Sequence, residues 1–348
     1  MSQGYDRPVT AAGALRLHLN ENTAGCSPKV LDALRALGRE ELAFYPDYDA
    51  VYRETAEYLG VPESSLLLTN GLDEGILLAA VIALKRRPAE GDFESIVILP
   101  AFDMYAISVE AIGGRVVNVS PRADFTFPLE NTLAAVTQRT RVVYITSPNN
   151  PTGVRVSNDD IRAVARAVPP EALVFVDEAY YDVCGDTVVH ELGSLPNVIV
   201  GRTFAKAQGL AALRAGAIIA VPETLDGFKP VIPPYSLNVA AAAALRAALA
   251  DRDYLAWYVG EVRDSRERFY AFCRRHGFHY WKSGANFVLA RVGDHATPLT
   301  DALRARGIYI RDKSADPNCR GCIRVTTGTV EATEAAISAM EEYLCAAQ

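Results

Sequence analysis

The feature that most constrains the fold is the alternation of short, uniformly apolar segments with amphipathic ones between residues 66 and 221. The apolar segments are typical of strands buried on both faces of a sheet, and the amphipathic ones of helices that cover it. We therefore expect an α/β fold, a mainly parallel sheet with helices on both faces. The expected strands are residues 66–68, 96–99, 116–119, 142–146, 173–176, 198–200 and 217–221, and the expected helices are 72–84, 103–112, 129–136 and 159–167.

The pattern changes near the proline-rich residues 230–234, which predict a domain border. Beyond them we expect an alanine-rich helix and a long amphipathic helix, followed by short strands mixed with helices, which is typical of a smaller α+β domain. The predicted division is an N-terminal arm and part of the small domain at residues 1–43, a large domain at 44–234 and a C-terminal small domain at 235–348.

Composition excludes several classes of function. Half of the 348 residues are apolar, which supports a sizeable core, and the net charge of −7 argues against a nucleic-acid binder or a protein of anionic membrane surfaces. We expect no membrane helix and a cytoplasmic protein, since no apolar run approaches the roughly 20 residues needed and the start is polar. Of six cysteines only Cys319 and Cys322 are close, as C-R-G-C, which is weak support for a metal or redox site, so we predict free thiols and no metal.

A lysine in a small-residue segment is the first candidate for catalysis. Lys206 has no acidic residue near it in sequence, and an apolar setting would lower the pKa of its amine and make it a nucleophile that can form an imine. Thr203 and Arg214 flank it, and Arg214 could reach an anion. The alternative is a solvated surface lysine with an arginine at a helix end.

Further candidates follow the ends of expected strands, where ligands gather in open α/β sheets. Asp177 could pair with a cationic ring nitrogen, and Tyr180 could bond a phenolate oxygen. Asn150 lies in a stiff loop with two flanking prolines, Gly71 precedes a helix whose start could bind an anion, and Phe102 could stack on a planar ring. Each has an ordinary structural alternative. Asp177 could be a capping aspartate and the Asn150 loop a simple turn. Gly71 could mark one helix start among several, and Phe102 could be a core aromatic.

The motifs S-P-N-N-P-T-G, V-D-E-A-Y, R-T-F-x-K-x-x-G-L-A-x-L-R and I-R-V-T-x-G-T occur in this order, at residues 147–153, 176–180, 202–214 and 323–329. With them the chain resembles the fold-type I pyridoxal-phosphate-dependent aminotransferases, and is most similar to the histidinol-phosphate aminotransferase branch. The resemblance covers nearly the whole chain. It implies a large domain that binds pyridoxal 5′-phosphate beside a smaller α+β domain.

The resemblance also implies roles for the residues around the cofactor ring. Lys206 would form the internal aldimine and move the proton between the substrate and the cofactor, and Asp177 would keep the ring nitrogen protonated. Asn150 and Tyr180 would bond the phenolic oxygen, and Phe102 would stack on the ring.

Around the phosphate and the substrate the implied set is larger. The 5′-phosphate would be held by Gly71, Leu72, Asp73, Thr203 and Arg214, and by Tyr45 reaching the neighbouring subunit, which implies a homodimer with shared sites. Arg324 and Asn20 would bind the substrate, and Tyr5 and Arg311 would contact its phosphate.

Two departures from the family pattern, at Ala205 and Tyr5, and one open alternative, at Arg311, bear on these expectations. Ala205 stands where a serine usually contacts the phosphate. Tyr5 lacks the preceding proline found in histidinol-phosphate enzymes, and Arg311 could equally be a surface arginine.

The implied function is a ping-pong aminotransferase that acts on small molecules, with histidinol phosphate as first donor and 2-oxoglutarate as acceptor. The alternatives are an aminotransferase for another amino acid, aromatic or from specialised metabolism, or a decarboxylase, lyase or cyclase on the same scaffold. A non-catalytic binding module would lack the lysine, and a dinucleotide enzyme would need a G-x-G-x-x-G turn that the sequence lacks.

Overall fold

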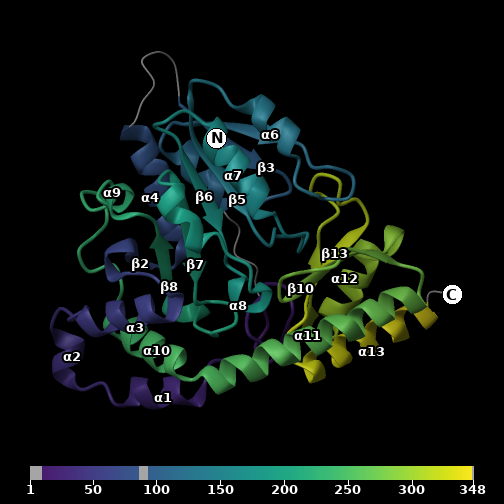
Figure 1. Ribbon diagram of the computed structural model, residues 1–348. Helices are drawn as coiled ribbons and strands as arrows, with labels where there is room; N and C mark the ends of the chain where they lie inside the picture. The colour runs from purple at the N-terminus through teal and green to yellow at the C-terminus, as the bar shows by residue number, and fades with distance from the viewer. Residues whose placement is uncertain (1–9, 86–92, 347–348) are drawn as a thin grey trace.

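The structure is a computed structural model that describes residues 10–85 and 93–346 (Figure 1). A seven-stranded sheet forms the larger part, and a four-stranded sheet with long helices beside it forms the smaller part. In chain order the elements are β1 (Leu15–Arg16), α1 (Pro28–Arg35), α2 (Arg39–Ala43), α3 (Asp49–Leu59), β2 (Leu66–Asn70), α4 (Leu72–Lys85), β3 (Glu94–Ile98), α5 (Met104–Ala111), β4 (Arg115–Val119), α6 (Leu129–Ala135), β5 (Thr140–Thr146), α7 (Asn158–Ala167), β6 (Leu173–Asp177), α8 (Tyr181–Cys184), β7 (Val198–Thr203), β8 (Ala215–Ile219), α9 (Pro222–Leu225), α10 (Val239–Ala250), α11 (Arg252–Arg275), β9 (His279–Tyr280), β10 (Phe287–Arg291), α12 (Ala296–Ala305), β11 (Ile308–Tyr309), β12 (Arg311–Asp312), β13 (Cys322–Thr326) and α13 (Val330–Ala346).

The large sheet has the strand order β2-β8-β7-β6-β5-β3-β4. Its pairs from β7 to β4 are all parallel, whereas β8 runs antiparallel to both of its neighbours, β7 and β2. The predicted α/β fold with a mainly parallel sheet is therefore confirmed, with β8 as the one reversed strand of this described sheet. A parallel sheet of this kind brings the carboxyl ends of its central strands to one edge.

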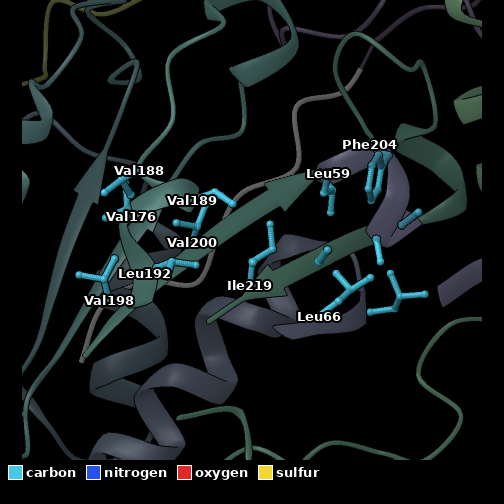
Figure 2. Close-up of a cluster of buried hydrophobic side chains, with 14 of the residues drawn as sticks. Leu59, Leu66, Val176, Val188, Val189, Leu192, Val198, Val200, Phe204 and Ile219 are labelled. Carbon is cyan, nitrogen blue, oxygen red and sulfur yellow. The ribbon is translucent and has the colours of Figure 1, made fainter. Parts of the chain in front are cut away.

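Each central strand contributes side chains to both faces of the sheet, because successive residues of a strand point in opposite directions. In β6, Val174 and Val176 lie in one apolar core, while Leu173 and Phe175 lie in the other. Figure 2 shows part of the first core, where Val176, Val198 and Val200 pack near Leu192. Burial on both faces explains why these strands read as continuous apolar runs.

Helices cover both faces of the large sheet. Buried side chains of α4 and α5 complete one core, and those of α1, α3, α7 and α10 complete the other. Helix α10 lies beyond the expected border at residues 230–234, yet Ala241 and Leu245 belong to the same core as the sheet. The division into residues 1–43, 44–234 and 235–348 stays a prediction.

The smaller sheet is antiparallel, with the order β12-β13-β10-β9. Helices α11, α12 and α13 pack on it through a core that includes Phe269, Leu299 and Met340. Figure 1 shows α11 and α13 side by side, with α11 extending back towards the large sheet. Strand β1 pairs with β11, so the N-terminal segment is joined to this smaller part.

In the described residues, no helix combines the length and the apolar character that a membrane crossing requires. Cys319 and Cys322 are buried and unpaired, as free thiols.

Candidate active site

The candidate site lies where the central parallel strands end. In the sheet register, Thr146 at the end of β5 is opposite Asp177 at the end of β6, and Asp177 is opposite Gly201 on β7. Strand β7 continues to Thr203, and the loop with Lys206 follows. These residues meet because parallel strands of matched length end at the same edge of the sheet.

Asp177 is a buried carboxylate held at both oxygens. Its Oδ2 accepts a hydrogen bond of 2.6 Å from the Tyr105 hydroxyl, and its Oδ1 accepts one of 2.9 Å from the Ala179 N–H. Burial raises the pKa of Asp177 to about 6, against the opposing effect of these two donors. The carboxylate is therefore fixed in one orientation, with its charge only partly compensated.

Lys206 is half-buried, and its Nζ donates a hydrogen bond of 3.1 Å to the Leu19 carbonyl. Loss of hydration and the positive charge of Arg324 lower the pKa of Lys206 to about 8. At neutral pH a usable fraction of the amine is therefore free, as a covalent role with an aldehyde requires.

The segment of residues 18–20 crosses the site and contacts its side chains one after another. The His18 carbonyl accepts a bond of 2.6 Å from Arg324, and the Leu19 carbonyl accepts the bond from Lys206. The Asn20 side chain donates a bond of 3.0 Å to the Tyr180 hydroxyl. This segment, which we call the strap, thus sets the positions of a lysine, an arginine and a tyrosine together.

Arg324 comes from β13 of the smaller sheet and is buried. Besides its bond to the strap, it donates to the Oδ1 atom of Asn150 in the proline-flanked loop. Arg311 on β12 is its cross-strand neighbour. His18, whose pKa is lowered to about 4 by burial and then by Arg311, lies beside both arginines. The structure therefore joins Arg324, Asn150 and Arg311 in one positively charged region.

A second positive region lies at the first turn of α4. Arg214 donates a hydrogen bond of 2.6 Å to Asp73, and its guanidinium lies so close to Gly71 that an added Cβ would come within 2.5 Å of it. The N–H groups of Leu72 and Asp73 stand in the first helical turn, where intrahelical partners are lacking. Gly71 N–H is bonded to the Thr69 carbonyl. This turn suits an anion.

The Thr203 hydroxyl accepts a hydrogen bond of 3.2 Å from the Ala205 N–H, so its own proton can be donated elsewhere. Ala205 and Gly209 also line a cavity of about 370 Å³, together with Arg16 and Thr23. A cavity of this size admits a small molecule.

The remaining predicted residues have different positions. The Phe102 ring is half-buried and lies edge-on to Tyr105, with ring centres 5.9 Å apart. Tyr45 is 77% exposed and stacks on Tyr235. Tyr5 falls outside the described residues.

Sequence reasoning missed Tyr105 and Thr146. The Tyr105 hydroxyl contacts both Asp177 and the Thr146 hydroxyl, the latter at 2.8 Å. The sequence offered little to identify it, because an aromatic residue in a helix after an apolar strand is most simply a core residue.

These groups fit pyridoxal 5′-phosphate. Asp177 is a carboxylate for a ring nitrogen, and Lys206 is an amine of lowered pKa for an aldehyde. The turn at Gly71, with its lack of a Cβ beside Arg214, forms a cradle for a phosphate. The donor set thus meets the chemical demands of the ring, the aldehyde and the phosphate.

Comparison with known proteins agrees with this assignment. The family model for aminotransferase class I and II matches residues 13–340. Histidinol-phosphate aminotransferases of Anoxybacillus flavithermus and of a Geobacillus species are 35% and 34% identical, each over 95% of this chain, which spans 88% and 90% of their lengths. The solved structure of histidinol-phosphate aminotransferase from Sinorhizobium meliloti, in complex with pyridoxal-5′-phosphate, is 29% identical with a TM-score of 0.85 over 96% of this chain and 92% of its own. The chain therefore belongs to the aminotransferase class I and II family and is a pyridoxal-phosphate-dependent aminotransferase.

Proposed function

We propose that this aminotransferase takes the amino group of histidinol phosphate and passes it to 2-oxoglutarate. The names of its curated relatives support the donor. The observation that carries the proposal is the cross-strand pairing of Arg324 with Arg311 beside the strap. Guanidinium groups bind phosphate and carboxylate in a bidentate manner, so neighbouring arginines suit a donor with a phosphate and an acceptor with two carboxylates.

Each site residue has a separate role in this proposal. Pyridoxal phosphate, when bound, supplies an electron sink for the bond changes at the substrate α-carbon. Asp177 would hold the ring nitrogen, and Tyr180 with Asn150 would hold the phenolic oxygen. Lys206 would hold the cofactor covalently and carry the proton that moves at the α-carbon. Phe102 would stack on the ring.

The phosphate of the cofactor is assigned to the first turn of α4, through Gly71, Leu72 and Asp73, together with Thr203 and Arg214. Ion pairing of Arg214 to Asp73, with both side chains partly exposed, leaves the guanidinium at the turn. Both half-reactions then use one site, since donor and acceptor present an anionic group to the same arginines.

We further propose a homodimer in which Tyr45 completes the phosphate site of the other subunit. Tyr45 is 77% exposed, and Phe44 and Leu42 beside it are 70% and 64% exposed. So contiguous an apolar surface is typical of a subunit interface. Tyr235, which stacks on Tyr45 with ring centres 4.1 Å apart, belongs to the same surface.

A cytoplasmic location is also proposed. The six cysteines, all within the described residues, are unpaired, which is typical of a reducing compartment. The partners are then the small-molecule donor and acceptor and a second copy of the chain.

The test is a donor screen by absorbance. The cofactor-loaded protein is mixed, without acceptor, with histidinol phosphate or with aromatic, acidic, basic or small amino acids, and the change of the cofactor band is followed. We expect rapid conversion with histidinol phosphate and none in the Lys206→Ala variant. Conversion by another donor alone would contradict the substrate and keep the aminotransferase.

Carbon dioxide release from an amino-acid phosphate would instead identify a decarboxylase on this scaffold. Transfer of the amino group to 2-oxoglutarate, measured as glutamate, separates the aminotransferase from this alternative. Absence of any cofactor band with cofactor supplied would contradict the assignment of Lys206.

A further inference from the structure

Tyr105 is a buried phenol outside the set of residues assigned to cofactor or substrate. It belongs to α5, and its side chain is 1% exposed. Its hydroxyl lies 2.6 Å from Asp177 Oδ2 and 2.8 Å from the Thr146 Oγ1. Burying a hydroxyl without a hydrogen-bond partner costs free energy. The position of the Tyr105 hydroxyl, at the ends of two neighbouring strands, is therefore favourable only because it makes these contacts.

The direction of the hydrogen bonds in this group follows from chemistry. An ionised carboxylate only accepts, so the single proton of Tyr105 is donated to Asp177. The Thr146 hydroxyl must then donate to Tyr105. With the Ala179 N–H on the other oxygen, each carboxylate oxygen of Asp177 has one protein donor.

Other charged groups also face Asp177. Asp73 of α4 opposes its ionisation, and Lys206 of the loop after β7 favours it. Burial is the largest effect and raises the pKa of Asp177 to about 6, whereas the Tyr105 and Ala179 donors act in the opposite direction. Tyr180 is a further neighbour of the Tyr105 hydroxyl. Removal of the Tyr105 donor would therefore shift Asp177 towards its neutral form.

The ring of Tyr105 is itself immobilised. It stacks on Tyr144, with ring centres 4.9 Å apart and planes at 15°. It also lies nearly perpendicular to Phe102, at 89°. Phe102 is the residue assigned to stack on the cofactor ring. Tyr105 therefore packs against Phe102 and also hydrogen-bonds Asp177, the carboxylate assigned to the ring nitrogen.

We propose that Tyr105 is a positioning residue that holds Asp177 ionised and in one orientation, ready to bind the ring nitrogen of the cofactor. The inference rests on the proposed role of Asp177. Thr146 acts through Tyr105 in turn, because its hydroxyl keeps the phenolic proton directed at Asp177.

The test compares Tyr105→Phe with Tyr144→Phe. Both changes remove one buried hydroxyl from stacked rings, but the Tyr144 hydroxyl donates to the Ile76 carbonyl at 3.2 Å rather than to Asp177. The dissociation constant of pyridoxal 5′-phosphate is measured across pH for each protein. For Tyr105→Phe we expect binding about tenfold weaker at neutral pH, from the loss of a hydrogen bond to a charged group.

The pH dependence of the cofactor dissociation constant distinguishes the two roles, because a purely structural role of Tyr105 would not change it. The ionised form of Asp177 binds the ring nitrogen, so affinity falls as pH drops through the pKa of the carboxyl. In Tyr105→Phe the pKa of Asp177 is raised, so the fall in affinity moves to higher pH. In Tyr144→Phe the pKa of Asp177 is unaffected, so the fall stays where it is in the wild-type protein. Thr146→Val should shift the profile in the same direction by a smaller amount, which keeps the test usable if Tyr105→Phe fails to fold.

A double-mutant cycle with Asp177→Ala completes the design. Without the carboxylate, Tyr105→Phe should no longer weaken cofactor binding. An equal loss in the presence and absence of the carboxylate, or a profile identical to that of Tyr144→Phe, would overturn the inference while the proposed function stands. A wild-type protein that binds no pyridoxal phosphate would overturn both.

Discussion

Lys206 shows at the scale of one residue how burial produces reactivity. Its pKa of about 8 results first from lost hydration and then from Arg324, whose charge disfavours a second cation nearby. Below this pKa the amine is protonated and cannot attack an aldehyde. We therefore predict that covalent attachment of pyridoxal phosphate accelerates about tenfold per pH unit up to about 8 and then levels off.

Stopped-flow absorbance on the cofactor-free protein measures this rate. An Arg324→Leu variant serves as the comparison, and its levelling point should move to higher pH because one positive charge is gone. A rate that climbs steadily towards 10.5, the ordinary pKa of lysine, would show that the amine is not perturbed.

Ala205 is the departure from the family pattern that lies closest to the proposed phosphate site. It is 8% exposed, and its N–H is already bonded to Thr203. A serine here would add a hydroxyl donor to a dianion, a gain of about 1.5–3 kcal/mol if the geometry is good. We predict that Ala205→Ser lowers the cofactor dissociation constant about tenfold or more, measured by equilibrium dialysis.

The matched control is Ala212→Ser, an exposed position on the same cavity, where the added hydroxyl meets water and affinity should not change. An unchanged dissociation constant for Ala205→Ser would mean that the phosphate lies out of reach of this side chain.

At the scale of elements, the strap links both parts of the molecule at the site. Asn20 adopts a φ of 57°, a conformation that asparagine and aspartate tolerate better than most residues. Asn20→Asp keeps this tolerance but replaces the Nδ2 donor to Tyr180 with an acceptor. The Tyr180 hydroxyl must then donate to the introduced carboxylate and is withdrawn from its proposed partner, the phenolic oxygen of the cofactor, so we predict that kcat falls at least about tenfold.

Steady-state kinetics with the identified donor checks this. Asn197→Asp is the control, since Asn197 likewise donates from Nδ2, to the backbone carbonyl of Ala165, but far along the chain from the strap. Equal kcat values for Asn20→Asp and wild type would show that Tyr180 does not depend on the strap.

Local patterns predicted much of the fold and supplied the candidates for the site, because strand periodicity and strand-end polar groups are local properties of sequence. Asp177, Lys206 and Asn150 lie at or after the ends of expected strands, so position made them candidates, and the ordered motifs gave them roles through the family resemblance. Contacts set by tertiary packing could not. The antiparallel direction of β8 depends on how the loop of residues 204–214 turns the chain back beside β7, and the role of Tyr105 depends on how α5 lies over the sheet.

The same limit applies to the N-terminal segment. Nothing in the order of residues 10–22 shows that β1 pairs with β11, nearly the whole chain away. That pairing places His18 and Leu19 beside Arg324 and Lys206. Long-range pairing of so short a strand is determined by the surrounding core rather than by its own propensity.

At the scale of the whole molecule, the exposed surface around Tyr45 is the feature that a single chain leaves unexplained. A symmetric dimer would cover it with the same surface or with the site region of a second copy. In the second arrangement each site contains Lys206 from one chain and Tyr45 from the other.

That arrangement predicts complementation between two inactive or weakened variants. Lys206→Ala lacks the lysine, and Tyr45→Ala lacks the tyrosine, so each homodimer carries two defective sites. Random reassembly of an equal mixture gives heterodimers in which one site has both residues, and about a quarter of all sites become native. We predict recovery to about that fraction of wild-type kcat after unfolding and refolding the mixture together, with light scattering to verify the dimer.

Mixing without refolding is the control. No gain above the average of the separate variants would place Tyr45 at its own chain's site or at none, because a residue acting within one chain cannot be supplied by another.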